Sequence, residues 1–427
     1  MRKDIFKLLV RQFMEKDLSQ VKERDFSLPL APDKVISIVG MRRTGKTCLL
    51  YLLARQLRES IPRENIVYVN FEDDRLFPLE LGDMDHLVQA YYELFPHKRE
   101  EQVHFLFDEI QNVPHWETFI RRLQDTENCQ ICITGSSSRL LGKKIATALR
   151  GRTLTYELFP LSFSEFLTFK GVEYVPYSPR SESEVKHVFA EYVERGGFPE
   201  VVNYEEDLLF RTLKEYLDMI IYKDIVERYR VTNLFVIRYL MHYLIRNMAN
   251  LVSPGKLFND LKSQGLKISK NTVYNYISFM EEAFALFFIP VWTSSLRKEW
   301  RNPKKVYVID HAVKKVLHTR EDTRRVYENI TFMHLRRRFA RVTYFKGRQE
   351  VDFFIENASP PLLLNVCYDF SAHETKTREV RGLITTMETL KINKAFLLTA
   401  DTTEEIKVGK KTLEVIPLWR WLLENQS

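Results

Sequence analysis

The sequence contains few cysteines, and this shortage limits the classes of protein to which it belongs. Four cysteines, Cys48, Cys129, Cys132 and Cys367, occur in 427 residues. Cys129 and Cys132 form a CxxC pair, but no second cysteine or histidine pair follows at the spacing of a zinc site. We therefore expect these side chains to pack as small apolar groups. A reducing compartment fits this usage, and we expect a cytoplasmic protein.

Long apolar runs are also missing. No stretch of about 18 uncharged apolar residues occurs, so we expect no membrane-spanning helix. Residues 1–18 are amphipathic and mixed in charge, without the apolar region of a signal peptide. Internal repeats and low-complexity segments are absent as well. The hydrophobic content of 45% is enough for sizeable cores, and the length predicts two to four domains.

One short stretch has the pattern of a phosphate-binding loop. Residues 35–39, VISIV, predict a buried parallel strand, and the apolar spacing after Thr47 predicts a helix. The join reads GMRRTGKT, which is the full P-loop pattern. Such loops bind phosphates through backbone N–H groups, with Lys46 at the β- and γ-phosphates and the Thr47 hydroxyl on Mg²⁺. The predicted nucleotide-binding set is Gly40, Arg42, Arg43, Thr44, Gly45, Lys46, Thr47 and Cys48.

An acidic strand end supplies the second part of a hydrolytic site. The apolar segment 103–107 runs directly into Asp108 and Glu109. We expect Asp108 to share the Mg²⁺ with Thr47, and Glu109 to act on the attacking water as a general base. The segment ICITGSSS predicts a further strand that ends in small polar residues, of which Thr134 or Ser136 would orient the water. The alternative for these two residues is a polar turn without a catalytic role.

The order of the N-terminal segments predicts an α/β fold. Residues 65–71 read as a strand, which we place between the P-loop strand and the acidic strand, and residues 156–158 read as a last strand. This is the layout of P-loop ATPases with an additional strand. The predicted architecture is a parallel sheet with helices on both faces and nucleotide at the carboxyl ends of the strands.

Three further regions follow. Residues 160–230 predict a helical lid that GGFPE, at 196–200, interrupts. Residues 231–318 predict a short helix, a turn at Gly265, and a longer helix capped by Ser269, followed by a strand at 307–309. This combination is winged-helix-like. Residues 319–427 predict a last α/β unit, with strands near 342–345, 351–355, 362–366 and 395–399. The predicted domains are therefore 1–159, 160–230, 231–318 and 319–427.

The buried stripe of the longer helix separates its two faces. The predicted stripe consists of Val273, Ile277, Met280, Phe284 and Phe287. The polar residues Lys270, Asn271, Tyr274 and Asn275 lie off it.

Together the motifs resemble a family of archaeal and bacterial AAA-type ATPases with a C-terminal domain of unknown function. The matching pieces are GMRRTGKT, VNFEDDRL, FLFDEIQNV, ITGSSSRLL, LRGRTLTYELFPLSFSEFL, GGFPE and EVDFFIE. The resemblance implies ATP with Mg²⁺, a winged helix in the middle and a restriction-endonuclease-like tail. It also places Arg150 and Arg152 where an arginine finger would act, within the chain or from a neighbouring subunit of a homo-oligomer. The alternative for these arginines is a solvated basic loop.

The tail departs from the pattern of an active nuclease. Glu328 and Asp352 qualify as first acidic residues of such a site, but the next strand should carry a glutamate and a lysine. That strand reads Asn365-Val366-Cys367. We therefore expect an endonuclease-like α/β domain that has lost DNA cleavage.

The positive charge is concentrated in one segment. Residues 291–350 hold 16 basic and 6 acidic residues, a surplus of +10, so the remainder carries −3 of the net charge of +7. This distribution favours DNA binding through residues 269–350. The alternative is a solvated basic face on an ATP-dependent switch or scaffold that binds a protein partner through the helical middle and the tail.

Overall fold

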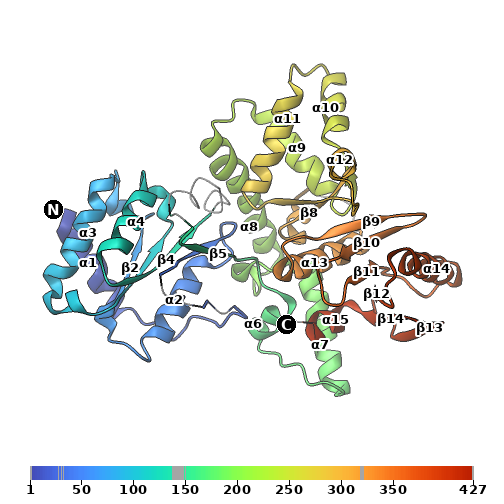
Figure 1. Cartoon of the computed structure of the whole chain (residues 1–427), viewed down its shortest axis with the longest axis horizontal. Coiled ribbons are helices and arrows are strands. Elements are labelled where there is room, and N and C mark those ends of the chain that lie inside the picture. The colour runs from blue at the N-terminus through green and yellow to red at the C-terminus, as the bar shows by residue number, and fades with distance from the viewer. Residues whose placement is uncertain are drawn as a thin grey trace. The chain divides into compact units, whose positions relative to one another are not determined.

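The chain folds into two compact units, Met1–Phe159 and Pro160–Ser427 (Figure 1). The structure is a computed structural model, and it describes all residues except 1, 27, 30, 32, 137–148, 150, 318–321, 426 and 427. Within the described part of the chain, no helix has the length and apolar character needed to cross a membrane.

The first unit is built on a five-stranded parallel sheet. Its strands are β1 (Val35–Val39), β2 (Ile66–Asn70), β3 (Val103–Asp108), β4 (Cys129–Gly135) and β5 (Thr153–Glu157). Their order across the sheet is β2-β3-β4-β1-β5, and every neighbouring pair is parallel. The predicted parallel sheet is confirmed.

One placement within this sheet was wrong. The strand between the P-loop strand β1 and the acidic strand β3 is β4, whereas β2, the strand expected there, lies at the edge. The two strands have similar buried apolar sequences, so the order depends on crossover connections and pairing partners that the local sequence does not specify.

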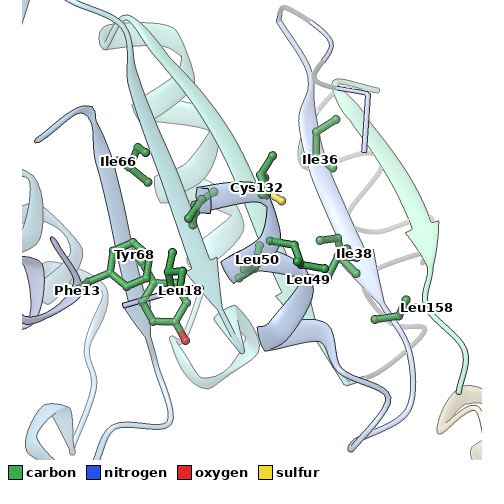
Figure 2. Close-up of a cluster of buried hydrophobic side chains, with 14 residues drawn as sticks. Phe13, Leu18, Ile36, Ile38, Leu49, Leu50, Ile66, Tyr68, Cys132 and Leu158 are labelled. Atoms are coloured by element: carbon green, nitrogen blue, oxygen red, sulfur yellow. The ribbon is translucent and has the colours of Figure 1, made fainter. Parts of the chain in front are cut away.

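Helices cover both faces of the sheet, as predicted. The helices are α1 (Arg2–Glu15), α2 (Lys46–Leu57), α3 (Leu81–Leu94) and α4 (Trp116–Thr126). Apolar side chains of α1 and α2 pack with Ile36, Ile38 and Cys132 in one buried cluster, which Figure 2 shows. Phe105 points to the opposite face, because side chains alternate along a strand, and contacts Tyr91 of α3 at a ring distance of 6.1 Å. Short 3₁₀ turns cover Arg63–Asn65, Asp74–Leu76, Pro96–Glu100 and Ile110–Asn112.

The second unit begins with helices. They are α6 (Phe163–Lys170), α7 (Pro179–Arg195), α8 (Glu206–Met219), the π-helical segment η7 (Ile220–Glu227) and α9 (Leu234–Arg246). The predicted helical character of 160–230 is confirmed. The GGFPE segment interrupts it, since the Gly197 N–H donates to the Asp310 carboxylate (2.7 Å) and a short 3₁₀ turn, Pro199–Val201, follows.

A small three-stranded sheet follows α9. The elements are β6 (Leu251–Val252), α10 (Pro254–Ser263), α11 (Lys270–Glu282), β7 (Leu286–Ile289), α12 (Leu296–Arg301), β8 (Lys304–Val308) and the 3₁₀ segment η8 (His311–Leu317). The sheet order is β6-β8-β7, and both pairs are antiparallel. Ser269 caps α11 as predicted, because its hydroxyl accepts the Thr272 N–H at 3.0 Å.

The predicted stripe of α11 is correct only in part. Val273, Ile277 and Met280 are buried in α11, but the helix ends at Glu282. Phe284 follows with a φ of 57°, and Phe287 is half-buried in β7. The apolar spacing continued beyond the helix because all four residues of β7 are apolar.

The last part of the second unit contains a mixed six-stranded sheet. Its strands are β9 (Thr343–Lys346), β10 (Glu350–Ile355), β11 (Leu362–Val366), β12 (Lys394–Thr399), β13 (Glu404–Val408) and β14 (Lys411–Pro417), in the order β13-β14-β12-β11-β10-β9. The helices are α13 (Thr323–Arg338), α14 (His373–Leu390) and α15 (Leu418–Glu424). The four strands predicted here are confirmed within one residue. β13 and β14 were not predicted: β13 is an exposed edge strand of largely charged residues, and β14 is buried only at alternate positions.

Candidate nucleotide-binding and hydrolysis site

The loop between β1 and α2 requires glycine at both ends. A Cβ on Gly40 would lie 2.2 Å from the Leu158 carbonyl oxygen, and Gly45 has a φ of 96°. Both conditions exclude a larger side chain. Between them, the buried Thr44 hydroxyl donates to the Met41 carbonyl at 2.9 Å, which closes the loop. The N-terminus of α2, which begins at Lys46, therefore follows a tightly turned backbone as a phosphate cradle requires.

Thr47 and Asp108 meet although 61 residues separate them. The Thr47 hydroxyl donates to the Asp108 Oδ2 at 2.7 Å. The Tyr68 hydroxyl donates to the same oxygen at 2.9 Å, and the Thr134 hydroxyl donates to Oδ1. Burial raises the pKa of the Asp108 carboxyl, although the hydroxyl donors oppose the shift. Three hydroxyl donors thus hold one buried carboxylate at the carboxyl end of β3.

This hydroxyl–carboxylate pair fits Mg²⁺. Magnesium in phosphate-transfer sites is held by one or two protein oxygens, with the remaining ligands from phosphates and water. Thr47 and Asp108 present such oxygens beside the phosphate loop. In the described residues, no group of three or more His, Cys, Asp or Glu side chains that would hold a metal by itself is found. The donor set therefore fits a metal that arrives with a nucleotide.

Glu109 differs from its neighbour in its charge environment. It adopts a φ of 52°, and its backbone N–H donates to the Thr134 hydroxyl at 2.9 Å. Its carboxylate lies 3.5 Å from the Lys46 ammonium and accepts a hydrogen bond from Gln111 at 2.5 Å. Burial raises the pKa of Glu109, but the Lys46 charge and the Gln111 hydrogen bond outweigh it, so the pKa lies below its ordinary value. Glu109 is therefore ionised at neutral pH.

The remaining predicted loop residues have different surroundings. Lys46 is buried, and its ammonium donates to the carbonyls of Gly40 and Met41 at 3.2 and 3.1 Å. Arg42 forms an ion pair with Glu72 at 2.7 Å. Arg43 is exposed, and Cys48 on the first turn of α2 is exposed as well.

At the end of β4, Thr134 and Ser136 are both buried. Thr134 contacts Asp108 and the Glu109 backbone, as described above, so its place is beside the acidic pair.

The two predicted arginines do not join this group. Arg150 lies outside the described residues. Arg152 precedes β5 at the start of the sheet, where its carbonyl accepts the Val35 N–H (2.7 Å) and its side chain pairs with Asp125. Because β1 and β5 are parallel, the P-loop lies at the other end of the strand, about 3.3 Å per residue away. Arg152 therefore does not approach the P-loop of its own chain.

Sequence reasoning missed Tyr68 and Gln111. Tyr68 lies in the continuous apolar run of β2, which gives no local signal for a site residue, and its ring stacks on Phe13 at 4.7 Å. Its hydrogen bond to Asp108 depends on the pairing of β2 with β3, in which Tyr68 neighbours Leu106. Gln111 carried a weak signal, since a polar side chain two residues after a catalytic carboxylate is well placed to hold it.

Comparison with known proteins identifies the region that carries this site. Residues 32–167 match a family model described as an AAA domain. Residues 186–323 match a second model, described as a domain of unknown function. Over 418 residues, the chain is 35% identical to an uncharacterized protein of Methanocaldococcus jannaschii, covering 95% of this chain and 92% of that protein. The chain belongs to the same family as that protein. An uncharacterized protein of Haemophilus influenzae is 30% identical, over 98% of this chain and 99% of its own length.

Similarity to solved structures is weaker. The Aeropyrum pernix ORC1 protein in complex with DNA is 15% identical and covers 73% of this chain and 91% of its own, with a TM-score of 0.31. AMPPCP-bound DnaA from Aquifex aeolicus is 13% identical and covers 64% and 86%, with a TM-score of 0.25. The parallel sheet β2-β3-β4-β1-β5 lies within the residues that match the AAA domain, and its order is consistent with an AAA-type P-loop fold for this part of the chain.

Proposed function

We propose that this AAA protein binds ATP with Mg²⁺ and hydrolyses it at the site between β1 and β3. The observation that carries the proposal is the contact between the Thr47 hydroxyl and the Asp108 carboxylate, 2.7 Å, with Glu109 beside Lys46 at 3.5 Å. A P-loop lysine, a metal-binding hydroxyl, a metal-shell carboxylate and an ionised base are thus assembled in one place. The match to an AAA domain supports ATP as the nucleotide.

Each residue has a distinct role in this proposal. The α2 N-terminus and the loop amides bind the phosphates, and Lys46 neutralises the charge on the β- and γ-phosphates. Thr47 and Asp108 hold the Mg²⁺. Glu109 accepts a proton from the attacking water. Thr134 positions Asp108 and Glu109 through its hydrogen bonds to the Asp108 carboxylate and the Glu109 backbone N–H. Ser136 is the candidate to orient the water.

In this proposal, a second copy of the chain supplies the arginine finger. Arg152 faces away from its own P-loop, and its side chain is 39% exposed. A finger that stabilises charge on the γ-phosphate would then be Arg152 or Arg150 of a neighbouring subunit. The proposed assembly is a homo-oligomer in which each site is completed across an interface.

The direct test replaces the phosphate-binding lysine. Lys46→Ala should abolish saturable binding of a fluorescent ATP analogue and stop turnover, while circular dichroism stays unchanged. Lys3→Ala, which removes an exposed ion pair with Glu93 in the same unit, is the matched control. ATP hydrolysis at the wild-type rate by a folded Lys46→Ala protein would refute the proposal.

We further propose that the segment from α9 to β8 is a winged helix that engages DNA. Helices α9, α10 and α11 and a three-stranded antiparallel sheet follow the order helix, strand, helix, helix, strand, strand, with the short helix α12 inserted between the last two strands, which supports this assignment. Lys270, Asn271, Tyr274 and Asn275 are all exposed on α11. This face offers hydrogen-bond donors and positive charge to a DNA groove.

Some of the basic side chains within residues 291–350 already interact with other groups of the protein. Lys305 is buried against carboxylates, Arg337 contacts the Pro160 carbonyl, and Arg338 donates to the Asn425 carbonyl at 2.7 Å. Arg297 and Arg301 on α12 are exposed. The proposed DNA contacts within residues 269–350 are therefore concentrated on α11 and α12.

For the tail, we propose an endonuclease-like domain without cleavage activity. Asn365 occupies β11 where a carboxylate would be needed, as the sequence indicated. An ammonium is nevertheless present, because Lys305 reaches from β8 to Glu328 at 2.9 Å and to Asp352 at 2.7 Å. Lys305 was not expected, because the pattern of an active nuclease places the lysine on the strand after the first acidic residue, which here is β11. These three side chains are 2–4% exposed and paired with one another, which supports a structural role. The four-part division at 159, 230 and 318 is part of this proposal.

A second candidate is an ATP-dependent switch that binds a protein partner. Leu296 and Trp300 on α12 are 71% and 82% exposed. Exposed large apolar side chains that lie close together are typical of protein-binding sites. The ATPase rate with and without duplex DNA separates the candidates, since only the first predicts stimulation by DNA.

A further inference from the structure

Helix α9 carries a ladder of aromatic rings on its outer face. Its inner face is buried along Val236, Ile237, Leu240, Met241, Leu244 and Ile245. The opposite face presents Phe235, Tyr239 and Tyr243 at intervals of four residues, which places them one above another along the helix. Phe235 is 60% exposed. Tyr239 and Tyr243 are half-buried, so the column of rings is open to solvent mainly at Phe235.

The three rings are nearly parallel. Phe235 and Tyr239 lie 6.4 Å apart with an angle of 22° between their planes, and Tyr239 and Tyr243 lie 6.2 Å apart at 27°. Rings held in this way turn their faces in a common direction. Flat π-systems such as nucleobases stack on faces of this kind.

Positive charge lies next to the ladder on the same helix. Arg238 and Arg246 are exposed. Each guanidinium makes one contact within the protein at 3.3 Å, Arg238 to the Tyr222 hydroxyl and Arg246 to the Leu317 carbonyl. A guanidinium has five N–H donors, so each retains donors for a ligand. Burial, followed by the charges of these two arginines, lowers the pKa of His242, which lies between them.

The rings and the arginines line one groove. It encloses about 670 Å³, within the range of small-molecule sites. Among the described residues that line it, none is acidic. Asp218 and Asp260 are near enough to affect His242 and Tyr243, but they do not belong to the lining. The groove therefore combines aromatic rings with two arginines in a lining that has no acidic residue.

We infer that this α9 groove binds single-stranded nucleic acid, with unpaired bases on the rings and phosphates on Arg238 and Arg246. A duplex cannot use the ladder, because its bases are stacked on each other. The carboxylates of an acidic peptide would pair with the arginines, but such a peptide has no flat π-systems to stack on the rings. The inference rests on the proposed function in one respect, that the chain binds nucleic acid. The α9 groove would be a separate nucleic-acid contact, outside residues 269–350.

The test measures binding of fluorescently labelled oligonucleotides to the full-length chain by anisotropy. The probes are single-stranded DNA, single-stranded RNA and duplex DNA of one sequence. Phe235→Ala should raise the Kd for single strands about tenfold, the scale of one lost base–aromatic stack, and Phe235→Trp should restore it. The matched control combines Tyr177→Ala and Arg180→Gln, an exposed aromatic and an exposed arginine of the same unit outside the groove.

A second variant keeps the test independent of the rings. Arg238→Gln with Arg246→Gln should reduce the magnitude of the log–log salt slope for single strands by about 1.4, since each phosphate contact contributes about 0.7. Duplex binding should stay unchanged in both groove variants. If they bind single strands as the wild type does while α11 variants lose duplex binding, the α9 inference is wrong and the proposed function stands. If the wild type binds none of the probes, the α9 inference and the proposed DNA binding both fail, whereas the proposed ATPase activity is tested separately by Lys46→Ala. Binding of an acidic peptide instead would overturn the assigned ligand.

Discussion

Asp108 and Glu109 are adjacent carboxylates that the fold places in different environments. Asp108 is buried among neutral hydroxyl donors, and burial raises its pKa. Glu109 is also buried, yet the Lys46 ammonium and the Gln111 amide bring its pKa below the ordinary value. Separate environments for paired acids are a common way to divide roles in catalysis. In the proposed mechanism these environments suit Glu109 to act as the ionised base and Asp108 to share its charge with a bound cation.

Replacing Glu109 should separate binding from hydrolysis. Glu109→Gln keeps the shape of the side chain but removes the base, so ATP should bind normally while the rate falls at least about 100-fold. Single-turnover hydrolysis of radiolabelled ATP measures the rate, and equilibrium binding measures retention. Glu72→Gln, which removes the carboxylate paired with Arg42, should hydrolyse normally. A Glu109→Gln protein with wild-type turnover would assign the base to another residue.

Tyr68 provides a test of how Asp108 is held. Tyr68→Phe removes the 2.9 Å hydrogen bond to the carboxylate without altering the buried ring. The Mg²⁺ concentration for half-maximal ATPase activity should rise about tenfold, the lower end of the range for lost supporting contacts at metal sites. Tyr51→Phe is the matched control, because the Tyr51 hydroxyl contacts Tyr68 at 3.4 Å. Equal Mg²⁺ requirements in the two variants would show that Tyr68 has only a packing role.

At the scale of elements, β8 connects the small three-stranded sheet to the tail. Its Lys305 ammonium contacts Glu328 of α13 and Asp352 and Glu350 of β10, at 2.9, 2.7 and 3.0 Å. Tyr307, two residues along β8, donates to Glu328 at 2.8 Å. Three carboxylates share this ammonium, and the charges of Asp352 and Glu328 also act on the nearby Arg324 guanidinium. Burial and the Asp352 charge raise the pKa of Glu328 to about 7.

This raised pKa predicts that stability depends on pH. The folded protein retains a proton on Glu328 that the unfolded chain releases near its ordinary pKa of 4.5. The resulting stabilisation is complete below that value and is lost as the pH rises to about 7. Unfolding in urea should show a loss of about 2 kcal/mol between pH 5 and 7.5 from this group. Glu328→Gln should flatten the dependence, and the exposed Glu356→Gln should not. Parallel curves for wild type and Glu328→Gln would contradict the assignment.

At the scale of the whole molecule, the proposed DNA contacts predict a salt-dependent affinity. Lys270→Glu, Arg297→Glu and Arg301→Glu together should weaken duplex binding for all sequences alike. The log–log salt slope should lose about 0.9 for each phosphate contact removed. Gel-shift titrations at two salt concentrations measure both effects. The matched control reverses Lys407 and Lys410, which are exposed on and just after β13. Absence of any shift at low salt and micromolar protein would remove duplex DNA as a partner.

The tail provides a second prediction at this scale. Supercoiled plasmid should remain intact with Mg²⁺ or Mn²⁺, because Asp352 and Glu328 are buried and paired with Lys305. Agarose gels over several hours measure this. Cleavage that disappears in Asp352→Ala would show that Lys305, Glu328 and Asp352 form an active nuclease site and do not serve only as a buried ion-pair cluster.

Local signals in the sequence determined much of this protein. Short stretches of five to fifteen residues were enough to predict several features. These are the P-loop, its flanking strand and helix, the acidic end of β3, the Ser269 cap and the four predicted strands of the tail. Each depends on side-chain periodicity, a cap or a glycine requirement, which act between near neighbours. The same periodicity misled at Phe284 and Phe287, where a helical spacing continued into a strand.

Only the tertiary structure decided which distant residues meet. It placed β4 between β1 and β3, turned Tyr68 into a partner of Asp108, and put Arg152 at the end of the sheet opposite its own P-loop. It also brought Lys305 to carboxylates 23 and 47 residues away. Strand order and such contacts depend on which buried surfaces pair best across the whole chain, and apolar strands of similar composition do not specify their partners locally. The P-loop, Asp108, Glu109 and Thr134 could therefore be picked out from the sequence, while the contributions of Tyr68 and Gln111 and the arrangement of the whole group depended on the fold.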